Sequence, residues 1–155
     1  MRKLTVLLMV AVVVCLFRPV LAKTPYQSDG DLQIEARQGF EQILDLWHDG
    51  KYGELYERTI KSGKETKEHF IARLGAAPLK PACCWEKMQD VSITVKKDNA
   101  VTLKAKVGLD GGVTNESKTR SFKLVKEDGV WKVSQADILS LSGATKTKKR
   151  YVRRK

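Results

Sequence analysis

Two adjacent cysteines are the residues of this chain with the clearest capacity for chemistry. Cys15 lies in an apolar leader, so Cys83 and Cys84 are the cysteines expected in the mature protein. They can bond to each other as a vicinal disulfide, bridge to another molecule or remain free thiols, and the sequence leaves these alternatives open. Zinc is not expected, because adjacent thiolates lack the spacing of a zinc knuckle. No metal or cofactor is therefore predicted.

The two histidines, His48 and His69, offer little catalytic potential. His48 falls near the end of a predicted helix and His69 lies beside an apolar residue within another. The one pairing of nucleophile and base worth considering is Cys83 with His69, and nothing in their spacing supports it. No catalytic residue is predicted. The alternative of a small isomerase-like or hydrolase-like enzyme remains open.

Three aromatic residues are candidates for lining a ligand pocket. Tyr52, Tyr56 and Trp85 flank predicted turns, whereas the other large aromatic residues fall at core spacing. Aromatic walls with polar tips suit small ligands. We therefore expect these three residues to face a small ligand, or otherwise to pack into the core.

The last twelve residues, 144–155, form a basic tail without acidic residues or apolar periodicity. Such a segment is expected to be disordered. It either solubilises the protein or contacts an anionic membrane or polymer, whereas specific recognition of nucleic acid is not predicted because no groove-reading or stacking element is evident. The basic residues concerned are Lys146, Lys148, Lys149, Arg150, Arg153, Arg154 and Lys155.

The first 22 residues resemble a cleaved secretory signal. Arg2 and Lys3 precede an apolar run that ends at Arg18-Pro19, and small residues follow at the expected cleavage site. An uncleaved membrane anchor is the alternative, although the run is shorter than the roughly 20 residues that span a bilayer. Export to the periplasm or the outside of the cell is predicted.

Removal of this signal leaves one domain at residues 23–143, followed by the tail. The whole chain has a net charge of +11, with three positive charges in the leader and seven in the tail. The domain itself is therefore close to neutral. Attraction to an anionic partner is expected from the tail.

Helical periodicity dominates the first half of the domain. Apolar residues recur at helical spacing from Ile34 to Trp47, with Asp31 expected to cap the helix and Gly50 to end it. A short apolar segment follows at residues 52–60. A third apolar segment lies between Ser62 and Gly75. Ser62 and Glu65 are expected to form a capping box at its start. Three helices are predicted before the strands.

A hairpin over residues 121–135 is the clearest local signal in the second half. The two-residue turn Asp128-Gly129 sets the register, because Asp-Gly suits tight hairpins. This register places one apolar row on the core side and mostly polar residues on the other. The predicted opposite pairs are Lys126 with Trp131, Leu124 with Val133, and Phe122 with Gln135.

Two alternating segments, residues 91–96 and 101–109, precede this hairpin. A three-residue loop over residues 97–99 would pair Val95 with Val101 and Ile93 with Leu103, which keeps the apolar residues on one face. The result is a four-stranded antiparallel meander. Residues 138–141 are a candidate continuation.

This order of three helices and long antiparallel strands resembles the nuclear-transport-factor-like superfamily, a cystatin-like α+β cone found in many small bacterial exported domains. The similarity covers about residues 31–141, and its most telling residues are Trp47 to Tyr52 and Leu124 to Val133. The resemblance implies an α+β fold with three N-terminal helices packed on a curved antiparallel sheet of about four strands. It implies no catalytic residue, because no set of aspartate and tyrosine matches the isomerase pattern.

The expected function is accordingly that of an exported, non-catalytic binding or interaction domain. The superfamily holds enzymes, binding modules and interaction domains, so the fold does not select among them. The partner is expected to be an unidentified small ligand or protein, with homodimerisation through the sheet as a further alternative.

Overall fold

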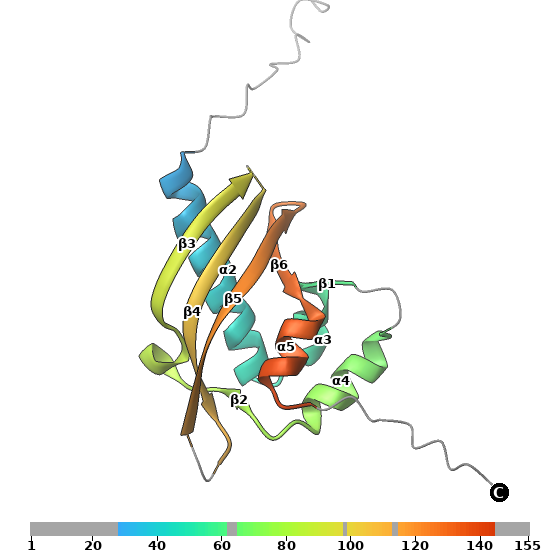
Figure 1. Ribbon diagram of the computed structural model, residues 1–155. Helices are drawn as coiled ribbons and strands as arrows, with labels where there is room; N and C mark the ends of the chain where they lie inside the picture. Colours follow the sequence, from blue (N-terminus) through green and yellow to red (C-terminus); the bar gives the residue numbers. More distant parts are fainter. Residues whose placement is uncertain (1–27, 62–64, 98, 113–114, 145–155) are drawn as a thin grey trace, which may run out of the picture.

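The computed structural model describes residues 28–61, 65–97, 99–112 and 115–144; the predicted signal and the basic residues of the tail lie outside these ranges. The described residues form an α+β fold with four α-helices, one 3-10 helix and a six-stranded mixed sheet (Figure 1). The elements in chain order are α2 (Asp29–His48), α3 (Tyr52–Glu57), β1 (Thr59–Ile60), α4 (Lys67–Gly75), β2 (Lys80–Pro81), η1 (Cys84–Lys87), β3 (Gln89–Lys97), β4 (Ala100–Asp110), β5 (Asn115–Glu127), β6 (Val130–Ser134) and α5 (Gln135–Leu141).

The first helix, α2, starts earlier than predicted. Ser28 caps it, and Asp31 is the third helical residue, whose side chain completes a capping box with Ser28. The prediction that Asp31 is itself the cap was wrong. Gly50 has a φ of 74°, which matches its expected role after the helix.

The next two helices are shorter than the patterns indicated. α3 ends at Glu57 because the following residues, Thr59 and Ile60, form β1 and pair in parallel with β6. α4 is capped by Thr66, whose side chain accepts a hydrogen bond from the backbone of His69. Ser62, the predicted capping residue, lies outside the described residues.

The predicted hairpin is present between β5 and β6. Leu124 pairs with Val133 and Lys126 with Trp131, and the turn residues Asp128 and Gly129 have φ values of 53° and 77°. Positive φ at both turn positions matches the right-handed twist of the strands.

The continuation of this hairpin was predicted wrongly. Gln135 does not pair with Phe122, because it begins helix α5, which is capped by Ser134. Residues 138–141 belong to this helix and not to a further strand. Their apolar side chains are buried at helical spacing, which a short segment cannot distinguish from strand spacing.

The pairing of β3 with β4 is as predicted, but the connection differs. Val95 pairs with Val101 and Ile93 with Leu103. Lys97 pairs with Ala100, and the register shifts between Val95 and Lys97. A bulge thus provides the extra residue that the sequence assigned to a three-residue loop.

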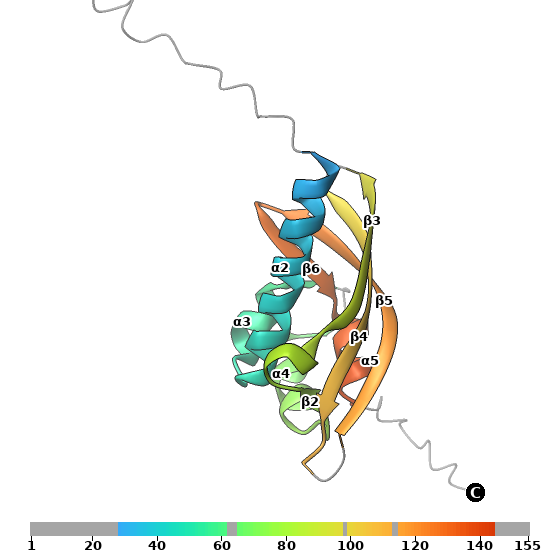
Figure 2. The ribbon, with the colours of Figure 1, turned by 90° about the vertical axis from the view of Figure 1, so that its left-hand side faces the viewer.

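The core lies between the helices and one face of the sheet. Figure 2 shows α2 running along the bent strands β3, β4 and β5. Phe40 of α2 packs against Phe122 of β5 with ring centroids 4.6 Å apart. Gly39 lies so close to β6 that an added Cβ would come within 2.7 Å of Trp131, which is 4% exposed. The absence of a side chain at residue 39 lets α2 reach the sheet.

One edge of β5 is only partly covered. β4 pairs with residues Asn115 to Val125, whereas β6 pairs with residues Leu124 to Glu127. Among the described residues, no strand pairs with the β6 side of β5 before Leu124.

Candidate functional site

A short segment between β2 and β3 combines several unusual features. Both strands pair with β4, and η1 bulges between them. The backbone of Ala82 donates a hydrogen bond to the carbonyl of Gly108 at 2.9 Å, and a Cβ at Gly108 would collide with the carbonyl oxygen of Glu86. Glycine on β4 therefore allows η1 to rest directly on the strand.

Left-handed backbone conformations flank this segment. Cys84 has a φ of 60° and Asp90 a φ of 51°, and neither is glycine. Such conformations cost free energy, and they cluster at functional sites more often than elsewhere. The Nζ atom of Lys87 also pairs with Asp45 of α2 at 2.6 Å. Contacts with two elements thus hold η1 in place.

The two cysteines stand at the start of η1. Their sulfur atoms are joined as a disulfide in the structure, and both residues are exposed. A vicinal disulfide is one of the three alternatives that the sequence left open for this pair. A disulfide between adjacent residues constrains only the backbone around Cys83 and Cys84, because it does not connect distant parts of the chain.

Trp85 follows these cysteines and is 73% exposed. The other two tryptophans, Trp47 and Trp131, are buried. An indole ring left in water on a segment held at both ends is a surface suited to stacking.

A shallow pocket of about 260 Å³ opens beside Glu86, the residue after Trp85. Its lining is mostly polar, and we refer to it as the η1 pocket. The lining residues are Ala82, Glu86, Gln89, Lys106, Gly108, Leu109, Asn115, Glu116 and Ser117. The sequence had singled out none of these, because they come from three separate segments and belong to no motif.

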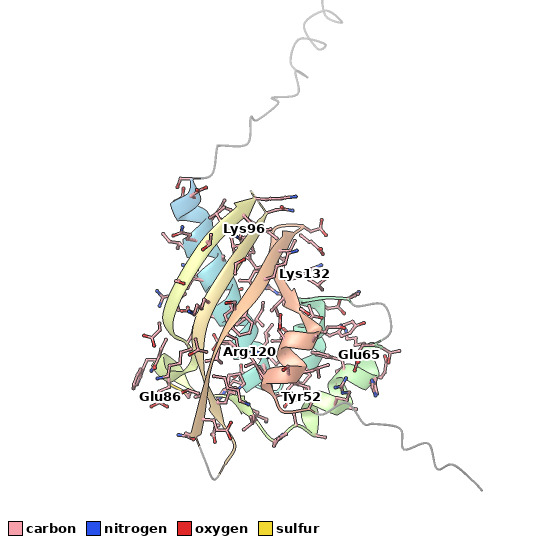
Figure 3. All side chains as sticks on the ribbon, in the orientation of Figure 1. Tyr52, Glu65, Glu86, Lys96, Arg120 and Lys132 are labelled. Atoms are coloured by element: carbon pink, nitrogen blue, oxygen red, sulfur yellow. A yellow bond between two sulfur atoms is a disulfide. The ribbon has the colours of Figure 1, made fainter. Side chains whose placement is uncertain are left out.

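The two tyrosines predicted to share a pocket with Trp85 do not line the η1 pocket. Tyr56 is buried, with its ring against Phe70 and its hydroxyl donating to the carbonyl of Glu65 at 3.3 Å. Tyr52 is half-buried beside Gly75. Figure 3 shows Tyr52 and Glu86 on different sides of the molecule. The three predicted residues therefore do not form one pocket, because Tyr52 and Tyr56 belong to α3 and Trp85 belongs to η1.

Both histidines make local contacts. The Nδ1 atom of His48 lies 2.9 Å from the carbonyl oxygen of Pro81, and that of His69 lies 2.8 Å from a carboxylate oxygen of Glu65. Helix α4, which carries His69, and η1 are on opposite sides of the lower end in Figure 1. The structure therefore does not bring His69 and Cys83 together as a catalytic base and nucleophile.

The outer side of the sheet is rich in lysine, serine and threonine. The pairings of β3, β4 and β5 place Ser92, Lys104 and Ser121 in one row, Thr94, Thr102 and Lys123 in the next, and Gln89, Lys106 and Thr119 in a third. Strand alternation adds Lys96 to the same side (Figure 3). We call this surface the lysine face and define it by Lys96, Lys104, Lys106 and Lys123 with the hydroxyl residues between them.

The lysine face carries no compensating acid in these three rows. Among the described residues, none of the ion pairs includes one of its four lysines. Lys106 also lines the η1 pocket, so the two surfaces adjoin. Glu86 and Glu116 line the η1 pocket with Lys106. Glu127 pairs with Lys132, and the side chain of Asp110 accepts a hydrogen bond from the backbone of Gly112.

One carboxyl has a perturbed pKa away from this surface. Burial raises the pKa of Asp137, in the first turn of α5, and the positive charge of Arg120 on β5 opposes this effect. Asp137 does not line the η1 pocket. The ionisation of Asp137 therefore affects the stability of helix α5 and not the η1 pocket.

Comparisons with known proteins add no assignment: no family profile matches the chain, and no curated protein matches it. Among the described residues, no group of three or more histidine, cysteine or acidic side chains is placed to hold a metal ion. Within the same residues, no helix has the length and apolar character needed to span a membrane.

Proposed function

We propose that this protein is an exported, non-catalytic binding domain of the nuclear-transport-factor-like type that holds an anionic polymer against its lysine face. The observation that carries the proposal is the set of four lysines on one side of the sheet that form no ion pair with a carboxylate of the described residues. In this view, the helices and the curved sheet form a cone, and its outer surface binds the ligand. The basic tail adds further positive charge.

A polymer fits this surface better than a membrane does. Stable binding to a bilayer usually combines basic residues with apolar side chains that enter the lipid. The rows of the lysine face contain hydroxyl groups in place of apolar side chains. Serine and threonine can donate hydrogen bonds to phosphate, sulfate or carboxylate groups that the lysines attract.

The alternatives have weaker support. An enzyme would need an acid and a base held in a pocket, whereas Glu86 and Glu116 of the η1 pocket are exposed. A homodimer through the outer sheet face would bring the lysines of two copies together, which is unfavourable.

The test is binding of the full chain to a polyphosphate of defined length, measured by calorimetry over a series of salt concentrations. Lys104→Gln/Lys123→Gln should weaken binding by roughly thirtyfold at low salt, because each of the two lysines near an anionic surface contributes about 1 kcal/mol. It should also reduce the salt dependence.

The control is Lys51→Gln/Lys61→Gln, which removes the same charge from exposed positions outside the lysine face. This variant should bind within about twofold of the native chain. Equal losses in the two double variants would show that only net charge matters, and the lysine face would then not be the site.

A further inference from the structure

We infer that the η1 pocket binds one sugar ring and that Trp85, the residue before Glu86, stacks on a neighbouring ring, so that the anionic polymer of the proposed function is an acidic polysaccharide. The inference rests on that proposed function and names its ligand class. It depends on the chemistry of the pocket, which differs from that of the lysine face beside it.

The pocket has the composition that a hydroxylated ring requires. Gln89, Asn115 and Ser117 offer both donors and acceptors, while Glu86 and Glu116 accept hydrogen bonds from hydroxyl groups. Leu109 and Ala82 provide an apolar surface for the C–H groups of a ring. The volume of about 260 Å³ is below the range typical of drug-sized ligands, so it suits a single ring and not a larger molecule.

The carboxylates of the pocket also disfavour an anionic group there. Glu116 pairs with Lys118 at 3.6 Å, whereas Glu86 is in no ion pair among the described residues, so Glu86 is the group that would repel a phosphate in the pocket. We therefore expect the charged groups of the polymer to bind Lys104 and Lys123, and its uncharged hydroxyl groups to bind in the pocket. This division of charge distinguishes a polysaccharide from polyphosphate, which has no uncharged hydroxylated part.

Trp85 supplies the stacking surface at this end of the sheet. Its indole ring is 73% exposed, and it directly precedes the pocket residue Glu86. The left-handed residues Cys84 and Asp90 and the contact of Glu86 with Gly108 fix the segment that carries it. A ring presented in this way loses little conformational freedom on binding.

Fluorescence quenching by acrylamide tests the inference, because Trp85 is the one exposed tryptophan of the three in the chain. An octamer that alternates hexuronic acid with neutral hexose should protect Trp85 of the full chain from quenching. Polyphosphate should bind without protecting it. Trp85→Ala should weaken binding of the octamer by about tenfold and change polyphosphate affinity less than twofold.

Two further variants give matched comparisons. Asn115→Ala, within the pocket, should weaken octamer binding without weakening polyphosphate binding. Ile34→Ala removes the other large apolar side chain that is exposed within the part of the chain that the structure describes, on α2, and should change neither affinity. Unchanged octamer affinity in Trp85→Ala, or equal protection by polyphosphate, would overturn the inference.

A neutral hexose tetramer separates this inference from the proposed function. Protection of Trp85 by millimolar tetramer supports the sugar site even when the lysine variants bind polyphosphate normally. Conversely, weakened polyphosphate binding in the lysine variants without any protection by sugars retains the anionic surface and rejects the sugar site. Trp85-dependent binding of oligodeoxythymidylate at least as tight as that of the octamer also rejects it, because base stacking would then explain Trp85.

Discussion

Gly39 and Trp131 form the closest approach between α2 and the sheet. Trp131→Ala should lower the free energy of unfolding by about 3–5 kcal/mol, because a large buried side chain is lost. Gly39→Ala should lower it by about 1–3 kcal/mol, because the new methyl group collides with the indole ring.

A double-mutant cycle measured by urea denaturation distinguishes this contact from general helix effects. With Trp131 replaced by alanine, Gly39→Ala should cost less, because the contacts with Cγ and Cδ1 of the indole ring are removed while the contact with the Cβ atom of residue 131 remains. Additive losses would mean that the two residues do not restrict each other.

At the scale of residues, the sequence predicts the core far better than the site. Phe122, Leu124, Trp131 and Val133 were assigned to the core from hairpin register alone, and all four are buried. The lysine face lies on the opposite side of the sheet from this apolar row. The sequence analysis interpreted the polar residues on that side only as facing solvent. Of the three aromatic candidates for the pocket, Trp85 is exposed, whereas neither tyrosine is.

At the scale of elements, the sequence predicted the ends of helices and strands correctly only where a turn residue marks them. Asp128-Gly129 set the β5–β6 register, while Ser134 and the short apolar run after it fitted a helix and a strand equally well. The η1 pocket lay beyond prediction for a different reason. Its existence depends on Gly108, which lets η1 contact β4, and no local pattern reveals which segment will pack there.

Asp137 gives helix α5 a pH-dependent stability. Because burial raises the pKa of this carboxyl in the folded protein, its ionised form destabilises the fold. The penalty is present at neutral pH and disappears as the pH falls below the ordinary pKa of aspartate, about 4. Asp137→Asn should therefore increase the free energy of unfolding at pH 7, and the gain should vanish near pH 3.5 in urea denaturation.

Glu68→Gln is the matched control for this change. Glu68 is also in the first turn of a helix, α4, but it is exposed. Loss of its charge should not stabilise the protein, because the helix dipole favours an acidic residue there. Stabilisation by both changes would point to overall charge and not to the burial of Asp137.

At the scale of the whole molecule, the lysine face and the basic tail are two separate sources of positive charge. The tail lies outside the described residues, and its seven basic residues exceed the four lysines of the lysine face in number. A chain ending at Gly143 should bind anionic vesicles much more weakly than the full chain at low salt, and the difference should shrink as salt screens the charges. Sedimentation with vesicles measures this effect, and equal retention of both chains would exclude a role for the tail.

The partly covered edge of β5 has a consequence for backbone dynamics. From Asn115 to Lys123 this strand has β4 on one side and no paired strand on the other among the described residues. In an antiparallel ladder, alternate amides point to opposite neighbours. Amide hydrogen exchange should therefore alternate between slow and fast along this stretch, and the alternation should end at Leu124, where β6 begins to pair with the strand.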